Sequence, residues 1–168
     1  MNPDRHEPPV SVDVIVESAR WEEHSGLEEL VHRAVAAAFE AGDLEALPEA
    51  ELAVLLADDA RVQELNRDYR DKDQPTNVLS FPAADPDEIA DAPHLGDLAL
   101  AYETLVREAD SEGKTFADHL AHLVIHGTLH IFGYDHGDDE EAEIMENCER
   151  RALARLGIAD PYKETSRH

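Results

Sequence analysis

The sequence predicts an α+β fold in which a small mixed β-sheet of about four strands is covered by about five helices. Strand and helix patterns alternate twice near the N-terminus, two further short strand patterns follow, and the last third of the chain has helical periodicity. A length of 168 residues with 42% hydrophobic content is enough for one core. We therefore expect a single domain over residues 10–162, with flexible termini at residues 1–9 and 163–168.

The first half of the chain contains two strand–helix pairs. Residues 10–16 alternate valine with mostly polar residues, which indicates a strand with one buried face. A capping-box spacing at Ser25 precedes a helical repeat of apolar residues that ends near Gly42. Residues 51–57 are apolar and predict the second strand. The two aspartates that follow them can cap a helix running toward Tyr69.

Two short strands and three helices are predicted in the rest. Residues 78–81 read as a strand that stops at Pro82, residues 85–93 as an exposed acidic excursion, and residues 95–101 as the fourth strand. The helices are expected at about 102–112, from Thr115 onward with Asp118 at the capping-box position, and after Asp138 to Leu156 with Gly157 as its C-cap. The pattern does not determine the strand order.

Composition limits the cellular compartment and the binding partners that the protein can have. The N-terminus lacks a secretory signal, no apolar run reaches the roughly 20 residues that span a bilayer, and the single cysteine, Cys148, cannot form a disulfide within the chain. We expect a cytoplasmic protein without a membrane partner, with Cys148 in a packing role. A net charge of −25 should repel a polyanion, so a nucleic-acid function requires a local exception.

Histidines cluster in the C-terminal half. Five of the ten lie between positions 119 and 136, and the first four fall within about 80° of one another on one helix face. His126 and His130, one turn apart, can share a metal ion, and a turn at Gly133 can return His136 as the third ligand. For the two earlier histidines we prefer packing, although the second, His122, could also orient a ligand or transfer a proton.

Three protein ligands leave one position of a tetrahedral zinc for water, which is typical of a catalytic site rather than a structural one. Zinc peptidases of the His-Glu-x-x-His type place a general base after the first ligand, whereas Gly127 stands there in this chain. The sequence therefore favours one zinc ion per chain in a hydrolase other than a peptidase.

The sequence resembles a known family, the YbeY-type endoribonucleases. The resemblance rests on three motifs: His126-Gly-Thr-Leu-His130-Ile-Phe-Gly133-Tyr-Asp-His136, then Leu65-Asn-Arg-Asp-Tyr-Arg70-Asp-Lys72-Asp-Gln-Pro-Thr-Asn-Val-Leu-Ser80-Phe-Pro82, and Leu95-Gly-Asp-Leu-Ala-Leu100. It covers nearly the whole chain. The proline-bearing N-terminal lead and the heavy acidity depart from the family pattern but lie outside the motifs.

The resemblance implies a zinc ion on His126, His130 and His136, a functional arginine at Arg70, and cleavage of single-stranded RNA rather than DNA. It further implies a role in 16S rRNA 3′-end maturation and ribosome quality control, with the ribosome or its proteins as partners. Arg70 and, more weakly, Lys72 are the candidate phosphate contacts, since a guanidinium matches two phosphate oxygens. Without the motif, a surface salt bridge would be the preferred interpretation of Arg70.

Residues 61–82 carry four basic and four acidic side chains, so this segment is neutral within an acidic chain. Residues 138–149 hold seven acids and no base, and we read them as a solvated helix face that RNA avoids. Several alternatives stay open: hydrolysis or attack by the 2′-hydroxyl, a metallopeptidase-like hydrolase, and a non-catalytic, zinc-stabilised ribosome assembly factor. The oligomeric state cannot be read from the sequence.

Overall fold

A computed structural model describes residues 9–70, 76–135 and 137–158. Its sheet contains the four predicted strands: β1 (Ser11–Val16), β2 (Glu51–Ala57), β3 (Val78–Pro82) and β4 (His94–Ala101). Their order is β1-β2-β4-β3, with β1, β2 and β4 parallel and β3 antiparallel to β4. The sheet is therefore mixed as predicted, and β3 is an edge strand.

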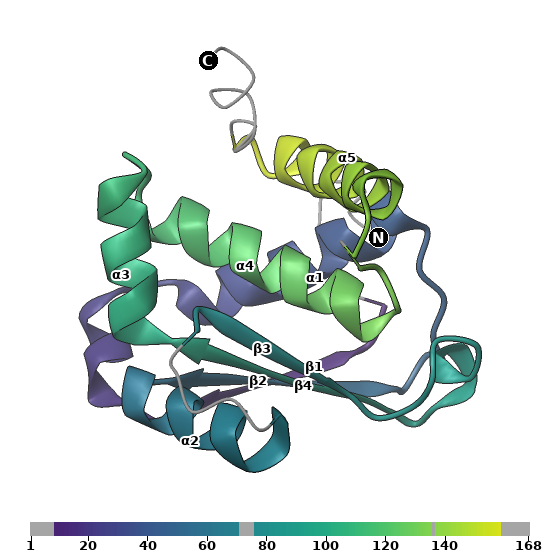
Figure 1. Ribbon diagram of the computed structural model, residues 1–168, viewed down its shortest axis with the longest axis horizontal. Coiled ribbons are helices and arrows are strands. Elements are labelled where there is room, and N and C mark those ends of the chain that lie inside the picture. The colour runs from purple at the N-terminus through teal and green to yellow at the C-terminus, as the bar shows by residue number, and fades with distance from the viewer. Residues whose placement is uncertain (1–8, 71–75, 136, 159–168) are drawn as a thin grey trace.

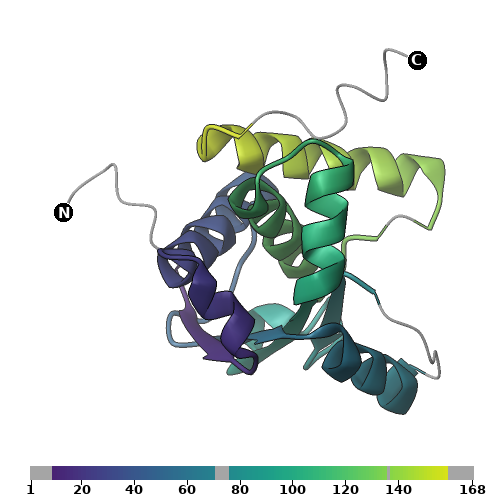
Figure 2. The same ribbon diagram turned by 90° about the vertical axis from the view of Figure 1, so that its left-hand side faces the viewer.

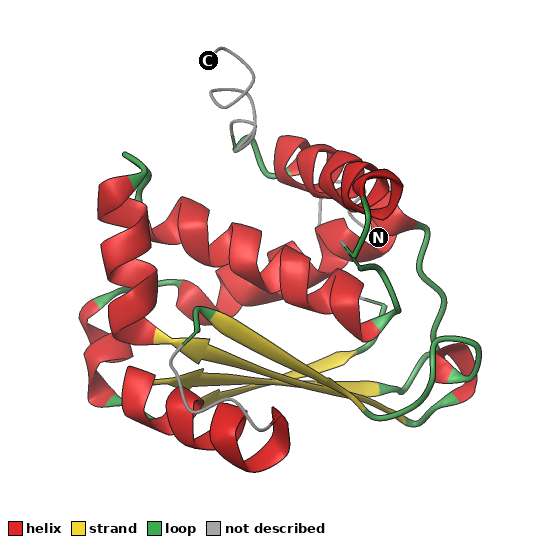
Figure 3. Cartoon of the chain, viewed as in Figure 1, coloured by secondary structure: helices red, strands yellow, loops and turns green. Residues whose placement is uncertain are grey.

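The five predicted α-helices are also present (Figure 1). They are α1 (Leu27–Gly42), α2 (Asp59–Arg70), α3 (Tyr102–Ser111), α4 (Phe116–Ile131) and α5 (Asp139–Arg155). Helices α1 and α4 lie on one face of the sheet with α5 packed beyond them, whereas α2 covers the other face (Figures 2 and 3). The α+β prediction is thus confirmed.

Alternation along β4 gives the sheet two apolar faces, because successive side chains of a strand point to opposite sides. Leu98 and Leu100 belong to the main core beneath α1 and α4, whereas Ala99 and Ala101 join a smaller cluster with Leu65 of α2. The alanines fill less volume on the α2 side than the leucines fill on the other side. The hydrophobic core on the α1 and α4 side of the sheet is therefore larger than the one on the α2 side.

Two of the predicted N-caps are confirmed, whereas the predicted C-cap of α5 is wrong, because Leu156 rather than Gly157 occupies that position. Thr115 Oγ1 accepts a hydrogen bond from the Asp118 N–H at 3.1 Å, and Asp58 Oδ1 accepts one from the Arg61 N–H at 2.8 Å. The prediction for α1 was wrong, since Gly26, not Ser25, is its N-cap and no side chain caps this end. Gly26 has φ 72°, so the backbone enters the helix through a left-handed residue that favours glycine.

Two short 3₁₀-helices, Ala19–Glu23 and Ile89–Asp91, were not predicted. The first buries Trp21, whose Nε1–H donates to the Ala57 carbonyl at 2.9 Å. The second buries Ile89, so the acidic excursion is anchored to the core rather than fully exposed. None of the helices in the described ranges has the length and apolar content that a membrane span requires.

Candidate metal centre

Helix α4 presents its histidines from a rigid position. Gly127 faces the sheet, where an added Cβ would lie 2.9 Å from Leu98 Cδ2, so the helix backbone approaches β4 closely. Ser80 of β3 donates its hydroxyl to the Gly127 carbonyl at 3.1 Å. Because one side of α4 is packed on the sheet in this way, the adjacent residue His126 is held at a defined place beside the edge strand.

His126 and His130 converge. Their Nε2 atoms are 3.1 Å apart, and both side chains are only partly exposed. Two nitrogens bound to one tetrahedral zinc at about 2.0–2.1 Å would be separated by about 3.3 Å. The two imidazoles are therefore spaced as neighbouring ligands of a single ion, as the sequence spacing predicted for this pair.

The third predicted ligand, His136, lies outside the described residues. Within residues 9–70, 76–135 and 137–158, no group of three histidine, cysteine, aspartate or glutamate side chains is arranged to hold a metal. The predicted turn is present: Gly133 has φ 97° and its N–H donates to the His130 carbonyl at 3.0 Å. The spacing of His126 and His130 is compatible with two of the three expected ligands, and the metal site itself stays a prediction.

Glu149 of α5 lies behind His126. Its side chain is 1% exposed, one carboxylate oxygen is hydrogen-bonded to His122 Nε2, and the other lies 3.2 Å from His126 Nδ1. Burial by itself raises the pKa of Glu149, but the hydrogen bonds from His122 and His126 outweigh it and lower the pKa to about 2. The carboxylate is therefore ionised near neutral pH and can only accept.

An acceptor at this position determines which nitrogen of His126 carries a proton. Because Glu149 cannot donate, Nδ1–H of His126 donates to it, and the lone pair of a neutral imidazole then lies on Nε2, facing His130. Carboxylates orient ligand histidines in this way in metal sites. The arrangement fits a metal-binding imidazole and gives His122 a place in the same hydrogen-bonded group.

Sequence reasoning missed Glu149, because it treated residues 138–149 as one solvated face. A signal was available in the apolar residues around it. Met145 lies four residues before Glu149, Cys148 one before and Ala152 three after, and all three are buried. Glu149 therefore shares their helix face. The burial of Cys148 agrees with its predicted packing role.

Of the other residues singled out in the sequence, the structure places His119 but does not describe the side chains of Arg70 and Lys72. His119 is buried, as the packing interpretation expected, and its Nε2 lies 2.9 Å from Glu108 Oε1, which also accepts from Asn77 Nδ2 at 3.0 Å. Arg70 is the last residue of α2, and its side chain is not described. Lys72 lies outside the described residues.

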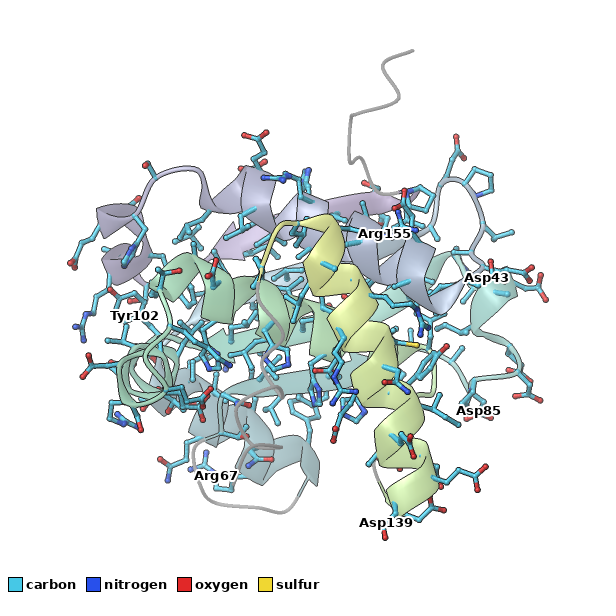
Figure 4. The ribbon with its side chains drawn as sticks, turned by 90° about the horizontal axis from the view of Figure 1, so that it is seen from above. Asp43, Arg67, Asp85, Tyr102, Asp139 and Arg155 are labelled. Atoms are coloured by element: carbon cyan, nitrogen blue, oxygen red, sulfur yellow. The ribbon has the colours of Figure 1, made fainter. Side chains whose placement is uncertain are left out.

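Figure 4 views the same region from above, with α5 passing over α4. In this view Arg67 of α2 and Asp139 of α5 both lie toward the lower edge, although α2 is below the sheet and α5 above it (Figure 1). Arg67 Nε pairs with Asp68 at 3.1 Å, so one aspartate considered as a partner for Arg70 is engaged with its neighbour. Arg70 ends α2 on the far face of the sheet, and the contacts of its side chain are not described.

Comparison with known proteins agrees with this architecture. The family model described as "Endoribonuclease YbeY" matches residues 10–157. A protein with this name from Rhodopseudomonas palustris (strain BisA53) is 51% identical over 162 residues, covering 95% of this chain and 94% of the relative. Another, from Azorhizobium caulinodans, is 54% identical over 159 residues, covering 91% and 96%.

A solution structure from Thermotoga maritima, TM1509, has the same fold. It superposes with a TM-score of 0.56 at 24% identity, over 87% of this chain and 91% of that one. The matched family region spans every helix and strand described above. Taken with the identities near 50% to its relatives, this shows that the chain belongs to the endoribonuclease YbeY family.

Proposed function

We propose that this protein is a zinc-dependent endoribonuclease that cleaves single-stranded RNA, acting in the cytoplasm on the 3′ end of 16S rRNA and in ribosome quality control. The proposal rests on the converging Nε2 atoms of His126 and His130, 3.1 Å apart, with the ionised Glu149 behind His126. Family membership supports the endoribonuclease activity, and the resemblance in its motifs supports the rRNA substrate.

His126, His130 and His136 would hold one zinc ion. When bound, zinc supplies Lewis-acid polarisation of a phosphoryl oxygen and a nucleophile at neutral pH. Glu149 keeps the His126 ring oriented and its Nε2 lone pair available. Arg70, at the end of α2, would bind the scissile phosphate through its guanidinium, with Lys72 as a second cation.

A peptidase is disfavoured by the packing around His126. Position 127 would have to carry the general base of a His-Glu-x-x-His peptidase. An added Cβ there would lie 2.9 Å from Leu98 Cδ2 and 3.3 Å from Ser80 Oγ, so a glutamate would have to displace these side chains and would face the sheet. Phosphodiester cleavage does not need a base at this place.

The decisive experiment measures bound zinc per chain and cleavage of a single-stranded RNA by the same preparations. Wild type should carry about one zinc ion and cleave. His130→Ala should lose both zinc and cleavage. Arg70→Ala should keep its zinc but cleave about a hundredfold more slowly, since a charge contact to the reacting phosphate is lost.

His6→Ala is the matched control, because His6 precedes the family region that begins at residue 10. It should behave as wild type in both assays. A His130→Ala protein that folds without zinc and still matures rRNA would instead identify a non-catalytic assembly factor. The end groups of the cleaved RNA separate the two chemical routes, because attack by the 2′-hydroxyl leaves a cyclic phosphate.

A further inference from the structure

A second feature lies on the opposite face of the sheet from the histidines. A pocket of about 290 Å³ opens between α2 and strands β2, β3 and β4. It is lined by Leu55, Leu65, Tyr69, Phe81, Asp97 and Ala99. Nothing in the proposed zinc chemistry uses these side chains.

Two aromatic rings form one side of this pocket. Tyr69 of α2 is 72% exposed, the highest value among the exposed large hydrophobic residues that the structure describes. Its ring meets that of Phe81 edge to face, with centroids 5.8 Å apart and an interplanar angle of 67°. Leu65, which is 9% exposed, already anchors α2 to the sheet. Packing of the helix therefore does not explain why an aromatic ring is left open at position 69.

The polar group of the pocket is an acid. Asp97 is the one charged residue in the described lining, and its carboxylate is partly exposed, 3.6 Å from His94 Nε2. A carboxylate with no cation in the described part of the lining disfavours a phosphate. It accepts hydrogen bonds from amines, and the rings offer a stacking surface. A neutral, flat, amine-bearing ligand matches this combination.

The position of the pocket relates it to the histidine site. Phe81 lines the pocket, while Ser80, the preceding residue of edge strand β3, points to the other face and bonds the backbone next to His126. Tyr69 directly precedes Arg70, the proposed phosphate ligand. A strand of RNA bound at the histidines and Arg70 therefore has this pocket beside its path around the sheet edge.

We infer that the pocket binds one unpaired nucleobase of the RNA substrate, stacked on Tyr69 and donating an amine hydrogen bond to Asp97. This inference rests on the proposed RNA-cleaving function and gives a reason for its single-strand selectivity. A base inside a duplex is paired and stacked on its neighbours, so it cannot enter the pocket. The nucleotide whose base enters the pocket would lie near the cleaved bond rather than at it.

The test combines abasic scanning with substitution of Tyr69. In wild type, removing the base at one position of a short single-stranded RNA should raise KM about tenfold, the effect expected for a lost base–aromatic stack. Tyr69→Leu should raise KM for the intact RNA by a similar factor, with kcat and zinc content little changed. The abasic substitution should then have no additional effect in Tyr69→Leu.

Two further variants refine the assignment. Tyr69→Phe keeps the ring and should recover most of the binding lost in Tyr69→Leu. Asp97→Ala should reduce the preference for adenosine over uridine at the sensitive position, because uridine has no exocyclic amine. Val106→Ala, which removes an exposed apolar side chain on α3 away from the pocket, is the matched control.

Binding is followed in parallel with an RNA that carries 2-aminopurine at the sensitive position, whose fluorescence falls on stacking. Quenching by wild type and not by Tyr69→Leu supports the pocket even if no preparation cleaves RNA, an outcome that would refute only the proposed activity. If wild type cleaves RNA but Tyr69→Leu has the same KM and abasic sensitivity, the pocket assignment is wrong and the nuclease assignment stands.

Discussion

Glu149 joins two histidines of α4 to α5 through a carboxylate that is buried and charged. Isolated buried charges are costly, so such a group persists only where hydrogen bonds compensate for lost hydration. Here His122 and His126 both donate to it. One side chain thereby ties the packing of α5 to the orientation of a proposed zinc ligand.

Replacing this carboxylate should weaken metal binding without removing a ligand. We expect Glu149→Gln to lower zinc affinity about ten- to a hundredfold, because an amide no longer favours the Nδ1–H form of His126 as strongly. Competition with a chromogenic chelator measures the change. The control is Glu146→Gln on the same helix, where the side chain is 37% exposed and pairs with Arg150 at 3.8 Å. Equal affinities for both variants would contradict the role of Glu149.

The pairing of β3 with β4 depends on Gly96. This residue has φ 146° and lies where the register between β2 and β4 shifts, since Glu51 and Leu52 pair with His94 and Gly96. An added Cβ would approach the Phe81 carbonyl oxygen to 2.3 Å and Ile131 Cδ1 to 2.8 Å. Gly96 thus permits close contact between the edge strand, β4 and the end of α4.

Gly96→Ala should therefore lower the free energy of unfolding by more than about 2 kcal/mol, from combined backbone strain and overlap. Gly113→Ala provides the comparison, because Gly113 also has a positive φ, 68°, but nothing lies within 4 Å of the added Cβ. Strain alone should cost about 1 kcal/mol there. Urea denaturation gives both values, and a smaller loss for Gly96→Ala than for Gly113→Ala would refute this account.

The histidine pair and most helices and strands could be predicted because each depends on neighbours along the chain. An i, i+4 spacing places His126 and His130 one turn apart whatever α4 packs against. The start of α1 was misplaced because Ser25 and Gly26 both satisfy local cap preferences, and the entry angle of the chain decides between them. Glu149 was missed because its acidic neighbours conceal its burial.

The net charge of −25 acts over the whole surface and opposes RNA binding. At 0.1 M salt, interactions between exposed charges more than about 10 Å apart are largely screened, so salt should reduce this long-range repulsion before it weakens the local phosphate contacts. The neutral segment at residues 61–82 should oppose RNA less than the chain as a whole does. The acidic start of α5 should instead repel RNA.

RNA affinity should therefore rise between low salt and about 0.1 M before it falls, unlike the steady decline of basic RNA-binding proteins. Fluorescence anisotropy of a labelled single-stranded RNA over a salt series measures this. Glu140→Gln combined with Glu143→Gln, two exposed positions of α5, should shift the maximum to lower salt. A steep monotonic loss of affinity in wild type would contradict this prediction, because it would show that local cations outweigh the repulsion from the net negative charge.

By itself, the sequence determined the α+β class, the identity of the strands and helices, and the pairing of two imidazoles, because these follow from periodicity and spacing over a few residues. Only the tertiary structure decided that β4 lies between β2 and β3, that Glu149 reaches His126 from another helix, and that Tyr69 and Phe81 share a pocket. These contacts join segments that are distant in the sequence, through the packing of helices on both faces of the sheet. Local sequence patterns do not indicate which distant surfaces will pack together.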